Sequence, residues 1–391
     1  YQIQAAQPPS DGVITAIEDN GKTAQIWLGG LLPQVLETYN PGTLLSTDRS
    51  LLQIYERNGL IARARALELP VNVGQRVQEA IRTLPKEMSL AIAIDATLNR
   101  VERVDAISAF SGLPRISATT AGEQAADYLF SKLEETTQVA SLTTDAMKGT
   151  IPPAGYALFS QGREAIPNTT GESGEAVKLA VKRLSPHLQT RLGAKLLSAT
   201  TNSDSSQLAV RATLIHADTK VAAQQTDRVS EPISDVVPSD GKLLSFSTGN
   251  PIQLKIENYN SEEIHFLVLG LNNDGSGVVL NPKQNEQAKS SIAPNEILTI
   301  PQAPSDWIAR SPAGLSEIYI VCSRTPFQQA EALMGTGEKF VRALPNFLDV
   351  AQAVLQDLHR ASGTSSWINT PELFTLNVNA WTTFRFLYQT V

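Results

Sequence analysis

Two Asn-Gly dipeptides, each set between runs of alternating apolar residues, constrain the start of the chain more than any other feature. Asn20-Gly21 divides residues 11–30, and Asn58-Gly59 divides residues 50–67. Asn-Gly provides the positive φ angles that a tight β-hairpin requires. A short helical stretch is expected at residues 33–39. Several short strands joined by tight turns predict a small β-barrel of the SH3-like type over residues 8–70.

After residue 75 the spacing of apolar residues changes, and helices and strands are expected in turn. The expected elements are a helix at 75–84 with Val77, Ile81 and Leu84 on one face, a buried strand at 88–98, a helix at 100–110 with Val101, Val104 and Ile107 on one face, a loop at 135–153, a strand at 155–160 and a strand at 207–217.

A long helix is expected between the last two of these strands. Thr169 and Glu172 have the spacing of a capping box. Val177, Val181 and Leu184 share one face of the helix that would follow. Ser185-Pro186 predicts the end of this helix and the start of another, because proline suits a first turn and not a helix interior. Together, residues 71–217 predict an α+β domain.

Residues 218–244 are polar and contain Pro232 and Pro238, which is typical of a linker. Residues 245–391 contain a series of strands and one amphipathic helix at about 346–361. We therefore expect an antiparallel β-sandwich-like domain with one helix, and a β-rich α+β fold for the whole chain. The residues of the helix that face inward are Phe347, Val350, Val354 and Leu358.

The composition argues against two classes of protein. A formal net charge of −7 and a pI of about 5.3 disfavour a nucleic-acid surface, which requires clustered Lys and Arg. Arg63 and Arg65 alternate with apolar residues and are expected on the exposed face of a strand. The longest apolar runs, such as residues 90–94, are much shorter than the ~20 residues of a membrane helix.

Residues 267–282 contain the most conspicuous polar motif, in which Asn272, Asp274 and Ser276 alternate. A calcium-binding loop that began at Asn272 would need a carboxylate at its twelfth position, where the chain has Lys283. The glycines of the motif match neither phosphate-binding template. The sequence therefore predicts a hairpin turn between two apolar strands.

Three other motifs have unspecific explanations. Residues 334–340 contain Gly335, Gly337 and Lys339 in a spacing that matches no phosphate-binding template, and they predict a loop. Asn168-Thr169-Thr170 matches the glycosylation acceptor pattern, which is a common triplet. Residues 100–105 alternate in charge and are expected to form a solvated helix face.

Cys322, the single cysteine, is the one thiol nucleophile that the chain offers. It shares a strand face with Ile318 and Ile320, so we expect a buried and unreactive thiol. A catalytic pair with His265 is not excluded by spacing alone, but both residues lie among large apolar neighbours.

The other histidines show no metal-ligand spacing. Two of them lie on or beside expected helices with charged neighbours, and solvated faces are expected for them. These histidines are His187, His216 and His359. The sequence therefore predicts no catalytic, cofactor or metal site.

The C-terminal strand is the segment most suited to contact a partner, because it is rich in aromatic residues. Burial in the core of its own domain is the stronger interpretation. The aromatic residues are Trp381, Phe384, Phe386 and Tyr388.

Several blocks resemble one group of proteins. They include "AIDATLNRVERVDAISAF" at 93–110, "IPNTTGESGEAVKLAVKRL" at 166–184 and "LNVNAWTTFRFLYQTV" at 376–391. These blocks are similar to the region that follows the protease domain in cyanobacterial caspase-family (orthocaspase-like) proteins. Residues 245–391 also resemble a bacterial domain of unknown function.

This resemblance implies a catalytic domain upstream of Tyr1. The sequence contexts of His265 and Cys322 do not match the caspase-type catalytic motifs, so no catalytic residue is carried over. The resemblance also implies export, and hence a periplasmic or cell-surface location. The first residue, Tyr1, indicates a processed product or part of a longer precursor.

We therefore expect a non-catalytic accessory region that binds or assembles proteins, with the upstream protease domain or another protein as its partner. Edge strands of its β modules offer sites for such pairing. The alternative is a processed structural protein that self-assembles into a surface layer or filament.

Overall fold

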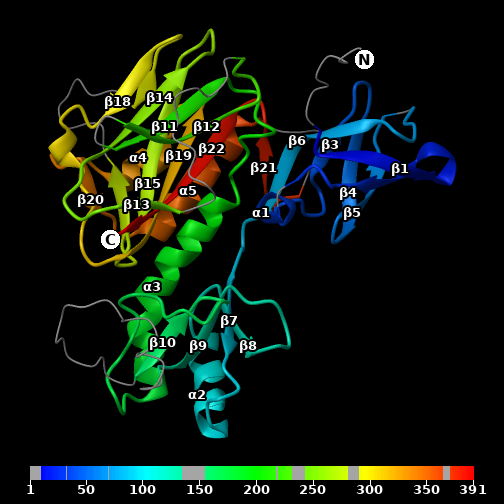
Figure 1. The fold of residues 1–391 in the computed structure, drawn as a ribbon. Helices are drawn as coiled ribbons and strands as arrows, with labels where there is room; N and C mark the ends of the chain where they lie inside the picture. The colour runs from blue at the N-terminus through cyan, green and yellow to red at the C-terminus, as the bar shows by residue number, and fades with distance from the viewer. Residues whose placement is uncertain are drawn as a thin grey trace, which may run out of the picture.

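The computed structural model describes residues 10–31, 33–68, 70–133, 155–216, 219–230, 243–280, 290–363 and 370–391. Three parts can be followed in Figure 1: a barrel formed near the N-terminus, a small α/β unit, and a larger β-sandwich with helices. The long helix α3 (Val177–Ser198) extends from the α/β unit to the sandwich. The β-rich α+β fold class is confirmed.

The N-terminal strands form a closed antiparallel barrel. Their order is β1-β2-β5-β4-β3-β6, and β6 pairs back with β1. Both predicted Asn-Gly hairpins are present, and Asn20 and Gly21 have φ angles of 55° and 91°. The SH3-like identity of the barrel stays a prediction. The elements are β1 (Gly12–Glu18), β2 (Thr23–Trp27), the expected short helix α1 (Pro33–Leu36), β3 (Leu44–Ser46), β4 (Leu51–Asn58), β5 (Ile61–Ala66) and β6 (Arg76–Pro85).

The helix predicted at residues 75–84 is wrong, because these residues form strand β6. Val77, Ile81 and Leu84 have helical spacing, but Val77 lies in the barrel core and Leu84 lies in the core beside α5 (Phe347–Ala361). The inward positions between them carry Glu79 and Arg82, two charged residues that a pattern of apolar spacing treats as exposed. Residues 76–85 form a strand because β6 pairs back with β1 and closes the barrel, which is a feature of the tertiary structure.

The α/β unit contains a four-stranded sheet of order β10-β9-β7-β8, in which β7 is parallel to β8 and β9. The predicted strands at 88–98 and 155–160 and the helix at 100–110 are confirmed. The expected apolar face of that helix is only partly correct. Ile107 packs against the core, but Val101 and Val104 are exposed, and Ala106 and Phe110 are buried instead. Residues 135–153 lie outside the described residues. The elements are β7 (Leu90–Ile94), α2 (Arg100–Ser111), β8 (Ile116–Thr120), β9 (Tyr128–Lys132) and β10 (Tyr156–Phe159).

Helix α3 differs from its prediction at two positions, its N-terminal end and Pro186. It begins at Val177, and Thr169 instead donates its hydroxyl to the carbonyl of Ile166 at 2.7 Å, so the capping box is wrong. The helix also continues through Pro186. Its first half packs on the α/β unit and its last turn packs against α5. This packing at both ends offsets the hydrogen bond that proline removes.

The sandwich consists of two sheets with an apolar core between them. The first sheet has the order β12-β11-β14-β18 and the second β13-β22-β19-β15-β16-β20, with β17 beside β15. The pairing is antiparallel except between β13 and β22. The strands are β11 (Val210–His216), β12 (Thr219–Gln225), β13 (Leu244–Phe246), β14 (Ile252–Asn258), β15 (Ile264–Leu271), β16 (Gly277–Leu280), β17 (Ser291–Ile292), β18 (Ile297–Ile300), β19 (Gly314–Ser323), β20 (Val341–Ala343) and β22 (Trp381–Thr390).

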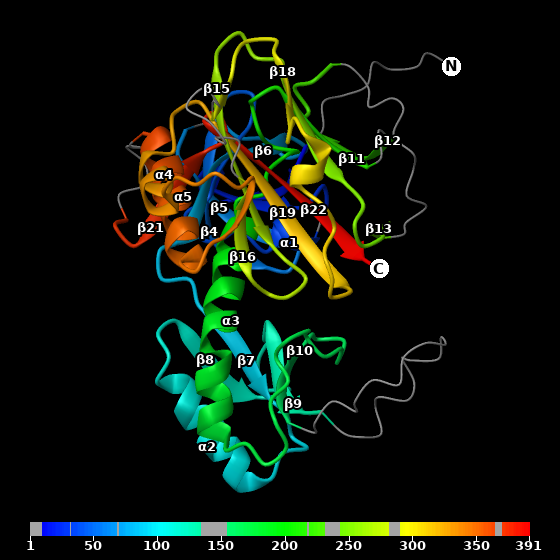
Figure 2. The same ribbon diagram turned by 90° about the vertical axis from the view of Figure 1, so that its left-hand side faces the viewer.

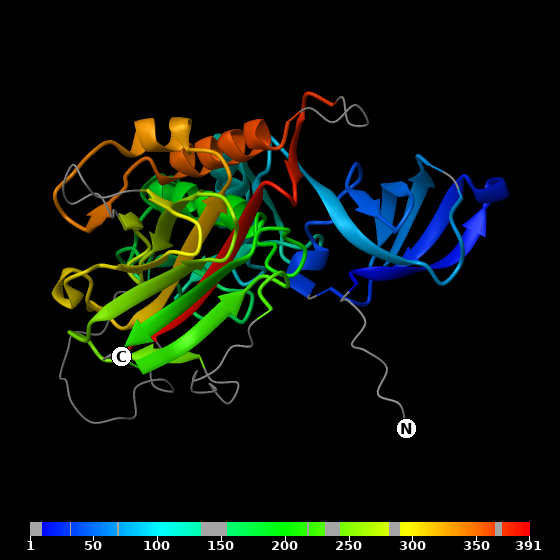
Figure 3. The ribbon, with the colours of Figure 1, turned by 90° about the horizontal axis from the view of Figure 1, so that it is seen from above.

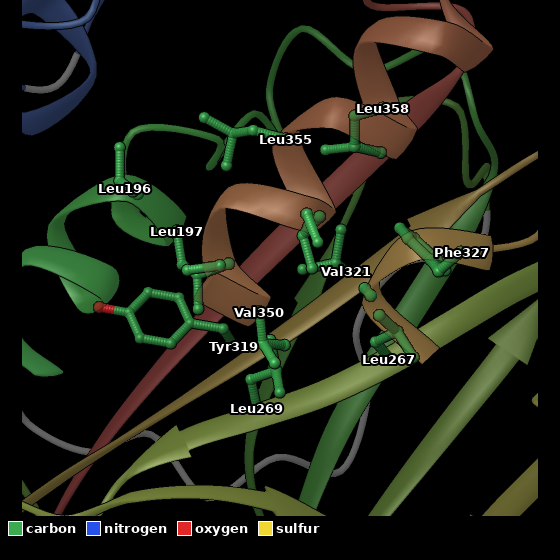
Figure 4. Close-up of a cluster of buried hydrophobic side chains, with 14 of the residues drawn as sticks. Leu196, Leu197, Leu267, Leu269, Tyr319, Val321, Phe327, Val350, Leu355 and Leu358 are labelled. Carbon is green, nitrogen blue, oxygen red and sulfur yellow. The ribbon is translucent and has the colours of Figure 1, made fainter. Parts of the chain in front are cut away.

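Helices cover the other face of the second sheet (Figure 2). Helix α5 matches the predicted amphipathic helix, but α4 (Gln328–Met334) adds a second, so the prediction of one helix is wrong. Figure 4 shows side chains of α5 and of the last turn of α3 meeting Leu267, Leu269 and Val321 of the sheet.

Hydrogen-bonded sheets cross the predicted domain limits, which themselves stay a prediction. Strand β6 belongs to the barrel, and β12 lies within the stretch expected to be a linker. Strand β21 (Leu373–Asn377), from the C-terminal part of the chain, pairs with the second half of β6 (Figure 3). The barrel and the sandwich are therefore joined through main-chain hydrogen bonds.

Candidate functional site

The motif at 267–282 is a hairpin turn, as predicted. Leu271 pairs with Gly277, and Asp274 Oδ1 accepts a hydrogen bond from the amide of Ser276 at 2.8 Å. Asn273 Nδ2 donates to the carbonyl of Arg310 at 2.8 Å. Its polar side chains therefore hold the turn together and dock it on neighbouring loops. Among the described residues, no group of three or more His, Cys, Asp or Glu side chains is arranged to hold a metal ion.

Cys322 and His265 point to opposite faces of the second sheet. Cys322 pairs with Phe266 and His265 with Ser323, and successive side chains of a strand alternate between faces. Cys322 lies in the sandwich core with Ile318 and Ile320, as predicted. Burial raises the pKa of its thiol to about 12, so the thiol stays protonated. The geometry does not bring a Cys/His pair together.

The remaining histidines lie in separate places. His359 on α5 accepts a hydrogen bond at Nδ1 from the amide of Thr375 at 3.0 Å and lies 2.9 Å from its hydroxyl. His187 on α3 is partly buried, and burial together with Arg191 lowers its pKa. Both side chains are half-buried, so the expected solvated faces are present only in part.

One other surface expectation is also corrected. Glu102, within the charged stretch 100–105, accepts a hydrogen bond from the hydroxyl of Tyr156 at 2.8 Å and pairs with Lys132. In the glycosylation triplet, Asn168 is exposed and Thr169 is buried. The aromatic residues of β22 are all buried, which confirms the core interpretation; these residues are Trp381, Phe384, Phe386 and Tyr388.

A buried charged cluster at the barrel–sandwich junction was missed by the sequence reasoning. The guanidinium of Arg82 makes two hydrogen bonds to the Glu79 carboxylate, at 2.6 and 2.7 Å, and both side chains are fully buried. Asp11 Oδ2 accepts from the Tyr39 hydroxyl at 2.9 Å and from the amide of Glu79 at 2.5 Å. Buried charges of this kind require such partners.

A β-bulge explains why Glu79 and Arg82 meet. In a regular strand, residues three apart point to opposite faces. Here Leu44 pairs with Ile81 and Leu45 pairs with Glu79, so β6 has an extra residue at this point. The bulge places Glu79 and Arg82 on the same side. The sequence spacing alone resembles a surface ion pair on a helix, and it carried no sign of the bulge.

The same cluster fastens the loop that follows α3. Arg82 Nη1 donates to the carbonyls of Ala199 and Thr201 at 3.0 and 2.6 Å. The hydroxyl of Ser205 donates to Glu79 Oε2 at 2.6 Å. From the sandwich side, the indole of Trp381 donates to the carbonyl of Thr200 at 2.9 Å. Residues of the barrel, the loop and β22 are thereby held in one arrangement.

A crevice of about 370 Å³ opens beside this cluster. Leu31, Val35 and Tyr39 line it on the barrel side, the loop contributes residues 201–205, and β12 and β22 complete it. Asp11 also lines the crevice. Burial, and next the charge of Glu79, raise the pKa of Asp11 from its usual 3.8 to about 6. A pocket of this size with one perturbed acidic group is a candidate binding site.

Comparison with known proteins identifies part of the sandwich. Residues 245–326 match the family described as Domain of unknown function (DUF4384). This part of the chain is similar to the members of that family. It spans the segment from β13 to the end of β19 and agrees with the expected resemblance to a bacterial domain of unknown function. No curated protein and no solved structure gave a match. No helix among the described residues is long and apolar enough to cross a membrane.

Proposed function

We propose that the chain is a non-catalytic binding and assembly region of a larger protein. The observation that supports this most is the junction cluster: Arg82 joins the barrel to the loop after α3, and Trp381 joins that loop to the sandwich. Rigidly joined modules preserve the geometry of a binding surface and reduce the conformational entropy lost on association. The crevice between these modules provides a concave surface for a partner.

The proposed precursor is a caspase-like protease whose catalytic domain lies upstream of Tyr1. The sequence blocks that resemble the cyanobacterial caspase-family proteins support this, and the DUF4384 match is compatible with it. A periplasmic or cell-surface location is part of the proposal and rests on the same resemblance. The partner would then be the protease domain itself or a protein that it cuts.

Two measurements test the function. Intact mass and N-terminal sequencing of the protein from its natural source determine whether the mature chain begins at Tyr1 or extends upstream. Size-exclusion chromatography of the whole chain, alone and mixed with the separately produced upstream domain, then measures association. Co-elution with that domain supports the proposal. A mature chain that begins at Tyr1 and forms large assemblies by itself as its concentration rises would instead support the self-assembling structural protein.

A further inference from the structure

The walls of the junction crevice include both apolar and acidic side chains. Leu31, Val35 and Leu387 contribute apolar surface, and Asp11 and Asp204 contribute carboxylates. Side chains of lysine and arginine have the same two parts, because a long aliphatic stem carries a charged end group. A volume of about 370 Å³ is sufficient for such a side chain and the residues flanking it.

Asp11 has one carboxylate oxygen in use and one left for a ligand. Oδ2 accepts both the Tyr39 hydroxyl and the Glu79 amide. Among the described residues, the structure records no donor to Oδ1. The residue is only 6% exposed, yet it lines the crevice. A carboxylate at the wall of the crevice can accept a charge-assisted hydrogen bond from a cationic donor there.

Two arginines beside the crevice are already paired with carboxylates. Arg385 lines the crevice, but its guanidinium binds Glu317 Oε2 at 2.9 and 3.2 Å. Arg82, behind Asp11, is occupied by Glu79. Asp204 is exposed at the crevice. Burial, and next the negative charge of Asp204, raise the pKa of Asp227. These charges around the crevice favour the binding of a cation over the binding of an anion.

We propose that this crevice binds the side chain of a lysine or arginine residue from a partner polypeptide, with its charged end at Asp11 and Asp204 and its stem along Leu31, Val35 and Leu387. The inference rests on the proposed binding function and specifies the chemistry of the partner. Asp11 supplies the buried acceptor and Asp204 the exposed one. Burial makes the ionised form of Asp11 unfavourable, and a cation bound in the crevice stabilises that ionised form.

Short peptides test the proposal on the whole chain. Acetyl-Gly-Arg-Gly-amide, its lysine counterpart and its citrulline counterpart are titrated into the protein with isotope-labelled methyl groups. The citrulline side chain has nearly the shape of arginine and lacks its charge. We expect saturable shifts of the methyl signals of Leu31, Val35 and Leu387 with the two cationic peptides, and at least tenfold weaker binding of the citrulline peptide. Equal binding of all three would overturn the proposal.

Variants locate the site. Asp204→Asn removes an exposed charge, so the fold should be retained, and we expect cationic peptide binding to weaken at least fivefold. Asp48→Asn, an exposed aspartate in the barrel, is the matched control and should bind as the native chain does. Unchanged binding by both Asp204→Asn and Asp11→Asn would refute the assignment. Methylguanidinium binding as tightly as the arginine peptide would show a site for small cations instead of a polypeptide.

The outcome separates this inference from the proposed function. If the upstream domain co-elutes with the chain but Asp204→Asn and Asp11→Asn leave that complex intact and the peptides do not bind, only the cation site is wrong. If the peptides bind as expected and no protein partner associates, the site is real and the accessory function is wrong.

Discussion

Gln224 of β12 hydrogen-bonds to both main-chain groups of Arg385 in β22. Its Nε2 donates to the Arg385 carbonyl at 2.6 Å, and its Oε1 accepts from the Arg385 amide at 3.3 Å. The side chain of Asn202 binds the main chain of β22 at two different residues: its Oδ1 accepts from the amide of Thr383 at 2.9 Å, and its Nδ2 donates to the carbonyl of Trp381 at 3.1 Å. Two side-chain amides thus occupy an edge of β22 that would otherwise be open to another chain.

Replacing Gln224 with Leu should expose this edge. The change leaves the amide and carbonyl of Arg385 without their partners, and we expect unfolding to become easier by about 1–3 kcal/mol. Denaturant unfolding measures the loss, and hydrogen exchange of the Arg385 amide should accelerate. Gln389→Leu, at an exposed position of the same strand, should stay within about 0.5 kcal/mol. Slow exchange at Arg385 in the Gln224 variant would contradict this role.

Removing Arg82 should destabilise the junction strongly. Arg82→Met leaves Glu79 buried without its cation, and the expected loss is about 3–5 kcal/mol in the free energy of unfolding. The double variant Arg82→Met, Glu79→Gln should recover part of that loss, because no buried charge is left unpaired. Chemical denaturation of both variants measures the coupling. The control is Arg63→Met, since Arg63 is exposed and lies 3.8 Å from Glu56. A loss below about 1 kcal/mol for Arg82→Met would contradict the prediction.

Asp11 should make the protein less stable as the pH rises from about 4 to about 6. Its folded-state pKa of about 6 lies above the usual 3.8, so between these values the folded chain binds more protons than the unfolded chain. A difference of one pKa unit corresponds to about 1.4 kcal/mol, which gives a contribution of about 3 kcal/mol. Asp11→Asn, which is neutral at every pH, should remove this component and raise the melting temperature at pH 8. A higher melting temperature for the native chain than for the variant at pH 8 would contradict the sign.

The thiol of Cys322 should react only when the protein opens. It is fully buried in the sandwich core, and its raised pKa keeps it protonated. Labelling with a disulfide reagent at pH 8 should proceed at the rate of global unfolding and become rapid in denaturant. Cys322→Ala should leave partner binding unchanged and lower stability by about 1 kcal/mol. Stoichiometric labelling of the native protein within seconds would contradict a buried thiol.

Local turns and amphipathic periods could be predicted because short-range interactions determine them. The Asn-Gly hairpins depend on φ angles that two adjacent residues favour, and the turn at 272–276 depends on hydrogen bonds between near neighbours. Helix α5 was recognised because its apolar stripe has a regular period and faces one sheet.

Elements that serve two modules at once were not predicted. Strand β6 has its first half in the barrel and its second half beside β21, so its burial pattern follows neither a strand period nor a helix period. Helix α3 crosses Pro186 for the same reason, because packing at each of its ends outweighs a local preference.

The sequence by itself determined the types and turns of most local elements and the burial of Cys322, because those depend on contacts within one strand, helix or hairpin. The tertiary structure decided that Glu79 and Arg82 meet in the interior and that a crevice opens beside Asp11. Those features arise from a bulge and from segments more than a hundred residues apart, and a buried charge is stable only where folding brings its partner to it.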